Sequence, residues 1–162
     1  MPSDPCFRDS PPERILRLDV EEYVRYNWNL SLRYLAFMPF LIVIAPCRRQ
    51  NLRDYAEAVE VGVTKDSLVF CKEKTKTCWR CAPCDSGRMV KEIPLSQITD
   101  VKVIEPAGDC CPRESLFRVQ IQTAGKSGIE GPELEIMGLS EQDTHSLRAQ
   151  LKKGRKNQVM KR

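Results

Sequence analysis

The sequence has little of what enzymes use for acid–base or nucleophilic catalysis. Its 162 residues include one histidine, His145, and no nucleophile stands at a readable spacing from it. The carboxylates are scattered along the chain, without the pairing that general acid–base catalysis uses. A surface position in a helix is therefore the better interpretation of His145. We expect that the protein is not an enzyme.

Motifs for binding nucleotides or nucleic acids are also lacking. The segment Thr123 to Gly128, TAGKSG, carries the Gly-Lys-Ser of a phosphate-binding loop, but Gln120 stands where that motif needs its first glycine. We interpret this segment as the loop of a β-hairpin. Basic and aromatic residues do not alternate along the strand-like segments, so no nucleic acid is expected as a partner.

Export and lipidation signals are missing as well. The first residues lack a basic region followed by an apolar one, so no secretory signal peptide is expected. Pro2 stands where N-myristoylation needs glycine, and the chain ends without a prenylation motif. We expect a protein on the cytoplasmic side, not a secreted one. The eight cysteines are then expected as thiols, metal ligands or acylation sites before disulfides.

One long apolar stretch is present, Tyr34 to Cys47, fourteen residues without a charge. As a helix it would reach about 21 Å, short of the roughly 30 Å hydrocarbon core of a bilayer. Pro39 also interrupts helical hydrogen bonding in its middle. We expect a re-entrant or in-plane wedge at the cytoplasmic face of an intracellular or plasma membrane. A buried core helix and a single membrane span are the alternatives.

Aromatic and basic residues flank the apolar stretch, as is typical of segments at a membrane interface. A second basic cluster ends the chain, where residues 152–162 hold six Lys or Arg and no acid. We expect this tail to be mobile, and it is either a solvated terminus or a segment that lies on anionic lipid or nucleic acid. The residues predicted to contact lipid are Trp28, Arg33, Tyr34, Arg48, Arg49, Lys152, Lys153, Arg155 and Lys156.

Composition divides the chain into four parts. Residues 1–10 are expected to be a disordered lead, and 11–50 a helical region with the apolar segment 34–47. A helix is predicted to begin at Ser10, where a capping box stands, and Arg48 to Asp54 is predicted to be a polar connector. A folded domain is expected over 56–153, with a cysteine-rich insertion at 71–88 and a basic tail at 154–162.

Alternating apolar and polar residues predict strands through most of the region from 56 to 137. The predicted strands are 58–63, 67–71, 88–93, 99–104, 116–123 and 133–137. A C-terminal amphipathic helix is predicted over 141–153, capped by Ser140 and Asp143, with Thr144, Leu147 and Leu151 on its apolar face. The fold class is mainly β with helices, an α+β arrangement.

Four segments of this region resemble the bacterial PH-like (pleckstrin-homology-like) family of membrane-associated domains. They are VGVTKDSLVF (61–70), KEIPLSQITDVKV (91–103), FRVQIQTAG (117–125) and EIMGLS (135–140). The resemblance covers about residues 56–153. It implies an antiparallel β-barrel or sandwich capped by the C-terminal helix, in which Ile93 to Val101 forms a strand, a short helical turn and the next strand.

The same resemblance implies a membrane nearby and a non-catalytic adaptor that binds a protein partner or anionic lipid headgroups. Two features of this chain depart from the family. That family commonly has two transmembrane helices before the domain, whereas this chain has one short apolar segment. The cysteine-rich insertion has no counterpart in it.

The cysteine-rich insertion is the sharpest chemical feature of the sequence. Cys78, Cys81 and Cys84 form two overlapping C-x-x-C units, a spacing that lets two thiolates face one Zn²⁺ ion. Cys110 or Cys111 is the candidate for the fourth ligand. S-acylation, or reduced thiols without a role, are the alternatives. Cys47, beside the apolar stretch, is the best candidate for acylation.

The sequence is also compatible with two other functions. The protein could be a soluble, zinc-stabilised structural subunit of a larger assembly, with the apolar segment buried against a partner. It could also be an enzyme with a reactive cysteine, which requires a lowered thiol pKa, although no nearby histidine or helix N-terminus is visible to lower it.

Overall fold

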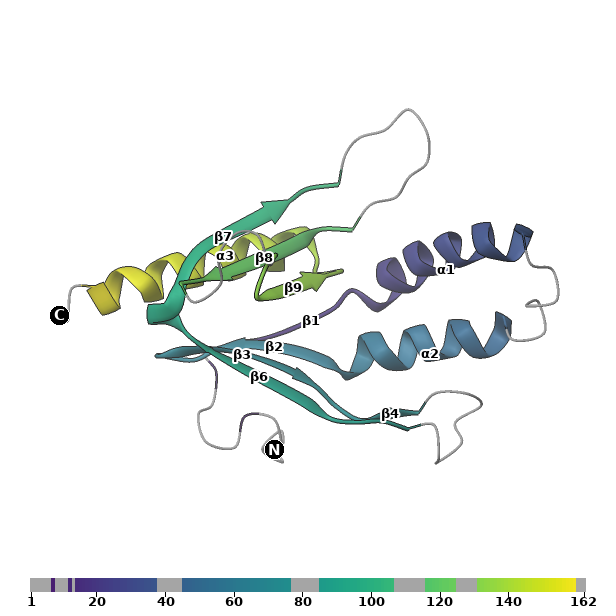
Figure 1. Ribbon diagram of the computed structural model, residues 1–162, viewed down its shortest axis with the longest axis horizontal. Helices are drawn as coiled ribbons and strands as arrows, with labels where there is room; N and C mark the ends of the chain where they lie inside the picture. Colours follow the sequence, from purple (N-terminus) through teal and green to yellow (C-terminus); the bar gives the residue numbers. More distant parts are fainter. Residues whose placement is uncertain are drawn as a thin grey trace.

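The computed structural model describes residues 7, 12, 14–37, 45–76, 85–106, 116–124 and 131–159. These residues form a mixed α+β fold in which two antiparallel sheets share one core and a pair of helices projects away from them (Figure 1). The predicted α+β class is confirmed.

The first sheet has the strand order β1-β2-β3-β6. Its strands are β1 (Ile15–Arg17), β2 (Val59–Val63), β3 (Ser67–Lys72) and β6 (Met89–Pro94). The turn between β2 and β3 is held by Thr64, whose Oγ1 accepts a hydrogen bond from the Ser67 N–H at 3.1 Å. A short two-stranded extension, β4 (Thr75–Lys76) with β5 (Asp85–Ser86), lies between β3 and β6 in the chain.

Strand β1 lies where the sequence analysis predicted helix. Leu16 pairs with Val61 of β2, and both side chains are almost completely buried. Arg17 remains on the solvent side and binds the Glu60 carboxylate at 2.7 Å. The prediction was wrong here because pairing with a strand distant in the sequence stabilises 15–17 more than a local helix would. Ser10, the predicted helix cap, lies outside the described residues.

The second sheet has the order β7-β8-β9. Its strands are β7 (Ile98–Ile104), β8 (Arg118–Thr123) and β9 (Leu134–Met137). Val119 and Ile121 are fully buried while Arg118, Gln120 and Gln122 are partly exposed, so the alternation predicted for this strand is confirmed.

The short helix η4 (Leu95–Gln97) carries the chain from the first sheet to the second. Leu95 is 1 % exposed, and its N–H donates to the Asp66 carbonyl at 2.9 Å. The predicted sequence of strand, helical turn and strand over Ile93 to Val101 is therefore confirmed.

Helix α3 (Glu141–Val159) contacts both β2 and β7 and so lies across the two sheets. Its cap is as predicted, since the Asp143 N–H donates to Ser140 Oγ at 3.2 Å. The predicted apolar face is also confirmed, since Thr144, Leu147 and Leu151 are at most 2 % exposed.

The predicted mobile tail is wrong as far as Val159, because α3 continues to that residue. The extension packs on the fold at Gly154, where a Cβ atom would lie 2.6 Å from Leu95 Cδ1. The described strands form two main sheets and the two-stranded β4-β5 ribbon, and they do not close into one barrel.

Helices α1 (Val20–Phe37) and α2 (Ala45–Ala58) lie side by side and antiparallel between β1 and β2 in the chain (Figure 1). We call this pair the helical hairpin. Asp19 caps α1, since its Oδ1 accepts the Glu22 N–H at 3.0 Å. The predicted polar connector, Arg48 to Asp54, is instead part of α2, because Arg, Gln and Leu favour helix and the pairing with α1 stabilises it.

Candidate functional site

The helical hairpin is fixed to the sheets at its root, where two tyrosines meet. The rings of Tyr23 in α1 and Tyr55 in α2 stack with centroids 5.8 Å apart, and Lys72 Nζ of β3 lies 5.1 Å from the Tyr55 centroid. Tyr23 also contacts the turn before α3, since a Cβ on Gly138 would lie 2.8 Å from Tyr23 Cδ2. The Asp19 N–H donates to the Gly138 carbonyl at 2.7 Å. The start of α1 and the end of α2 are therefore fixed against the sheets.

Burial changes the acidity of both tyrosines at the root. Desolvation, with a smaller contribution from neighbouring Tyr55, raises the pKa of Tyr23 to about 12. Burial also raises the pKa of Tyr55 above its usual value. Both phenols therefore stay neutral to higher pH than an exposed tyrosine would, which keeps their stacked rings uncharged there.

The far end of the hairpin is where the apolar stretch lies. Its first four residues close α1 at Phe37, and its last three open α2 at Ala45. Residues 38–44, MPFLIVI, lie outside the described residues. Because α1 and α2 are antiparallel, the two flanks of the stretch return toward the same side (Figure 1). None of the helices in the described ranges is long and apolar enough to cross a membrane.

The outer half of α1 leaves large apolar side chains in solvent. Leu30 is 41 % exposed and Leu32 is 44 % exposed. In the described part of the chain, the other exposed large apolar side chains are Met89 and Val90 on β6 and Ile104 on β7. The hairpin therefore offers apolar surface directly beside the apolar stretch.

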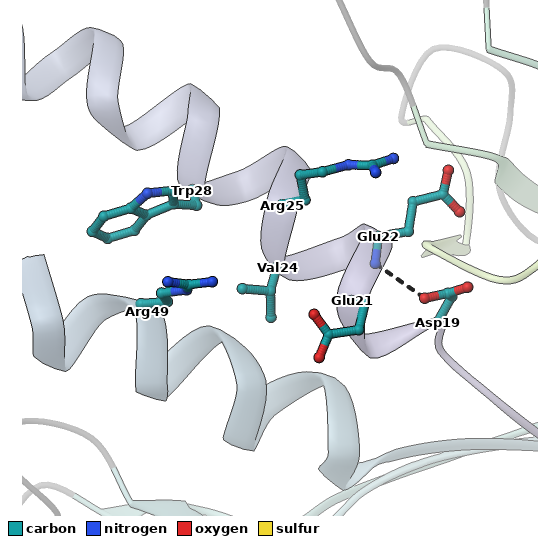
Figure 2. Close-up of a pocket in the computed structure, with 7 residues that line it drawn as sticks. All are labelled: Asp19, Glu21, Glu22, Val24, Arg25, Trp28 and Arg49. Atoms are coloured by element: carbon teal, nitrogen blue, oxygen red, sulfur yellow. Dashed lines mark hydrogen bonds between the residues drawn. The ribbon is translucent and has the colours of Figure 1, made fainter.

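One face of the hairpin holds a surface pocket of about 400 Å³ (Figure 2). Residues of α1 and the residue before it form most of its lining, and α2 contributes an arginine. Val24, which is 3 % exposed, is its buried apolar part. The lining residues are Asp19, Glu21, Glu22, Val24, Arg25, Trp28 and Arg49.

The charges of the pocket differ in what they already bind. Glu21 is paired with Arg53 across the hairpin at 2.7 Å, and Asp19 caps α1. Neither the Glu22 carboxylate nor the Arg49 guanidinium forms an ion pair with any residue that the structure describes. One negative and one positive group are thus available to a ligand.

The structure brings two of the predicted lipid residues together and separates others. Trp28 and Arg49 line the same pocket, and Arg48 is exposed one residue before Arg49 on α2. Arg33 and Tyr34 belong to the outer half of α1. The predicted basic residues of α3, by contrast, lie near its C-terminal end, which is at the opposite end of the long axis from the far end of the hairpin (Figure 1). These are Lys152, Lys153, Arg155 and Lys156.

The predicted zinc ligands all lie outside the described residues: Cys78, Cys81, Cys84, Cys110 and Cys111. Within the described ranges no three metal-ligating side chains gather at one point. Cys47, the acylation candidate, is a partly exposed free thiol in the first turn of α2. Cys71 is fully buried and disulfide-bonded, so the expectation of a thiol is wrong at that position.

Sequence reasoning missed the acidic residues of the pocket. The local signal that could have found them is Asp19, three residues before Glu22, a capping-box pattern that marks the start of α1. Their meeting with Arg49 depends on the antiparallel pairing of α1 and α2, which no local pattern shows.

Comparison with known proteins identifies no relative: no protein-family model, curated protein or solved structure matches this chain.

Proposed function

We propose that the protein is a non-catalytic, membrane-associated adaptor that inserts the far end of its helical hairpin into the cytoplasmic face of a membrane. The observation that carries this proposal is the return of both flanks of the apolar stretch to one side. A segment too short to span can enter one leaflet and leave it again when its ends are antiparallel.

The side chains along the outer half of the hairpin support this orientation. Leu30 and Leu32 are exposed where a membrane would cover them. Arg49 lies four residues after Ala45, so it stands about 6 Å along α2 from the end of that helix. Interfacial helices are buried about 5–10 Å into the headgroup region. At that depth, Arg48 and Arg49 would stand level with lipid phosphates.

The sheets and α3 supply the part of the adaptor that stands away from the membrane. Four strands, a helical turn, three strands and a C-terminal helix follow one another, and Ile93 to Val101 has the conformation that the PH-like resemblance implies. We propose a PH-like module on this ground, with the helical hairpin inserted between its first two strands. A protein partner or anionic lipid is its expected ligand.

Vesicle cosedimentation of the full chain tests the insertion. A double variant, Leu30→Ser with Leu32→Ser, should weaken binding to phosphatidylglycerol vesicles about thirtyfold, because completing the burial of each leucine contributes about 1 kcal/mol. Replacing Arg48 and Arg49 by glutamine should weaken binding further and reduce its salt dependence.

The matched control is Met89→Ser with Val90→Ser, which removes equally exposed apolar side chains from β6. This control should bind vesicles like the original chain. Equal losses in both double variants, or binding that does not change with salt, would contradict the proposed orientation. A folded protein that never binds vesicles would favour the soluble subunit, in which the apolar stretch packs against a partner.

A further inference from the structure

The pocket on the helical hairpin has its three carboxylates at one end, where Arg25 extends toward Glu22, and a second arginine at the other end (Figure 2). Arg49 and Trp28 lie on the side toward the far end of the hairpin, whereas Asp19, Glu21 and Glu22 lie on the side toward the sheets (Figure 2). The separation follows from the helix, because Glu21 and Trp28 are seven residues apart and so lie on one face about 10 Å from each other along the axis.

This polarity matches the direction in which a phospholipid headgroup leaves a membrane. The phosphate is attached to the glycerol and stands nearer the hydrocarbon, and an amine at the end of the headgroup stands farther out. In the proposed orientation the arginine end of the pocket faces the membrane and the carboxylates face away from it. A phosphate would therefore meet Arg49, and an amine would meet an end that is negative on balance, with three carboxylates and Arg25.

We propose that this pocket binds the headgroup of an amine-bearing phospholipid of the phosphatidylethanolamine class. The inference rests on the proposed membrane function. Arg49 binds the phosphate, and because its side chain is exposed and forms no ion pair with the described residues, its guanidinium can follow the phosphate along the pocket. Glu22, which likewise has no ion pair within the described ranges, accepts hydrogen bonds from the ammonium group.

The chemistry of the pocket favours a primary ammonium over a methylated one. Carboxylates form charge-assisted hydrogen bonds with N–H groups, which ethanolamine has and choline lacks. The aromatic ring that could attract a methylated ammonium, Trp28, lies at the arginine end, where the phosphate belongs. A lipid with a phosphate but no amine would leave the carboxylates without a partner.

The test compares two vesicle types with the full chain. Both contain the same fraction of phosphatidylglycerol, and the rest is phosphatidylethanolamine in one and phosphatidylcholine in the other. The expected ratio of affinities is about threefold in favour of phosphatidylethanolamine, the factor of one partly exposed ion pair. The double variant Glu21→Gln with Glu22→Gln should bring this ratio to one.

The control double variant is Glu57→Gln with Glu141→Gln, which changes the net charge equally on exposed helix positions outside the pocket. It should keep the preference. A ratio of one in the original chain, or an unchanged ratio in the Glu21/Glu22 variant, overturns this inference while binding to phosphatidylglycerol vesicles still upholds the proposed function. Loss of all vesicle binding overturns both.

A competition experiment separates a membrane lipid from a free ligand. If soluble glycerophosphoethanolamine competes for the pocket as strongly as the lipid does, the assignment to a membrane lipid is overturned and the pocket is assigned to a free phosphoamine.

Discussion

The sheet core and the helical hairpin treat their apolar side chains in opposite ways. Ile121 and Leu147 in the core are completely buried by other parts of the same chain. Leu30 and Leu32 on the hairpin are both more than 40 % exposed, beside the apolar stretch. The core is complete by itself, whereas the outer hairpin has apolar surface that the described fold does not cover. The difference separates residues that hold the fold together from residues whose apolar surface the described fold leaves in solvent.

Removing a core side chain should produce the largest effect. Leu147→Ala should lower the free energy of unfolding by about 2–5 kcal/mol, because it leaves a cavity between α3 and the sheets. Leu30→Ala should change it by less than about 0.5 kcal/mol, since that side chain is largely in solvent. Urea denaturation of both variants measures the contrast. Similar losses in the two variants would mean that the hairpin belongs to the core.

The root that joins the two regions should be next in sensitivity. Gly138 has φ 89°, and an added Cβ would lie 2.8 Å from the Tyr23 ring. Gly138→Ala should cost about 1–3 kcal/mol from backbone strain, plus the displacement of Tyr23. Gly131→Ala is the control, because Gly131 has φ 84° but open space around it. Equal melting temperatures for the two variants would show that Tyr23 does not hold the root.

A smaller effect is expected where α3 packs on η4. Glycine to alanine in a helix normally stabilises by up to about 1 kcal/mol. In Gly154→Ala the new methyl group would meet Leu95, which is buried and cannot move freely, so we expect a net loss of about 1 kcal/mol. Gly87→Ala, where no atom lies within 4 Å, should cause no such loss. Stabilisation by Gly154→Ala would mean that the end of α3 stands away from η4.

The smallest expected effect is a pH dependence at the root. The pKa of Tyr23 is raised from 10.0 to about 12 in the fold. The stability linked to the neutral phenol is therefore complete below pH 10 and is lost as pH rises from about 10 through 12. Tyr23→Phe should flatten the alkaline decline of the melting temperature, and Tyr26→Phe, on the same helix but outside the stacked pair, is the control. An equally steep decline in the Tyr23 variant would contradict the assignment.

Local patterns in the sequence determined most of the sheet fold. The alternation around Val119 and Ile121, the turn at Thr64 and the Ser140 cap each specify a conformation within a few residues. Such signals predicted the described strands from 59 onward except the short β4 and β5, and they predicted the start of α3. The flanks of the apolar stretch, with the predicted lipid contacts Trp28 and Arg49, could be identified from the sequence because they too are marked by residues close together in the chain.

Only the tertiary structure decided what depends on distant parts of the chain. Pairing with β2 made 15–17 a strand, packing of Gly154 on Leu95 accompanies the extension of α3, and the pairing of α1 with α2 brought Glu22 and Arg49 to one pocket. It also set the C-terminal end of α3 at the opposite end of the molecule from the far end of the helical hairpin (Figure 1). The physical reason is that side-chain period and capping act over a few residues, whereas strand pairing and helix packing gain their free energy from contacts between segments that the sequence keeps far apart.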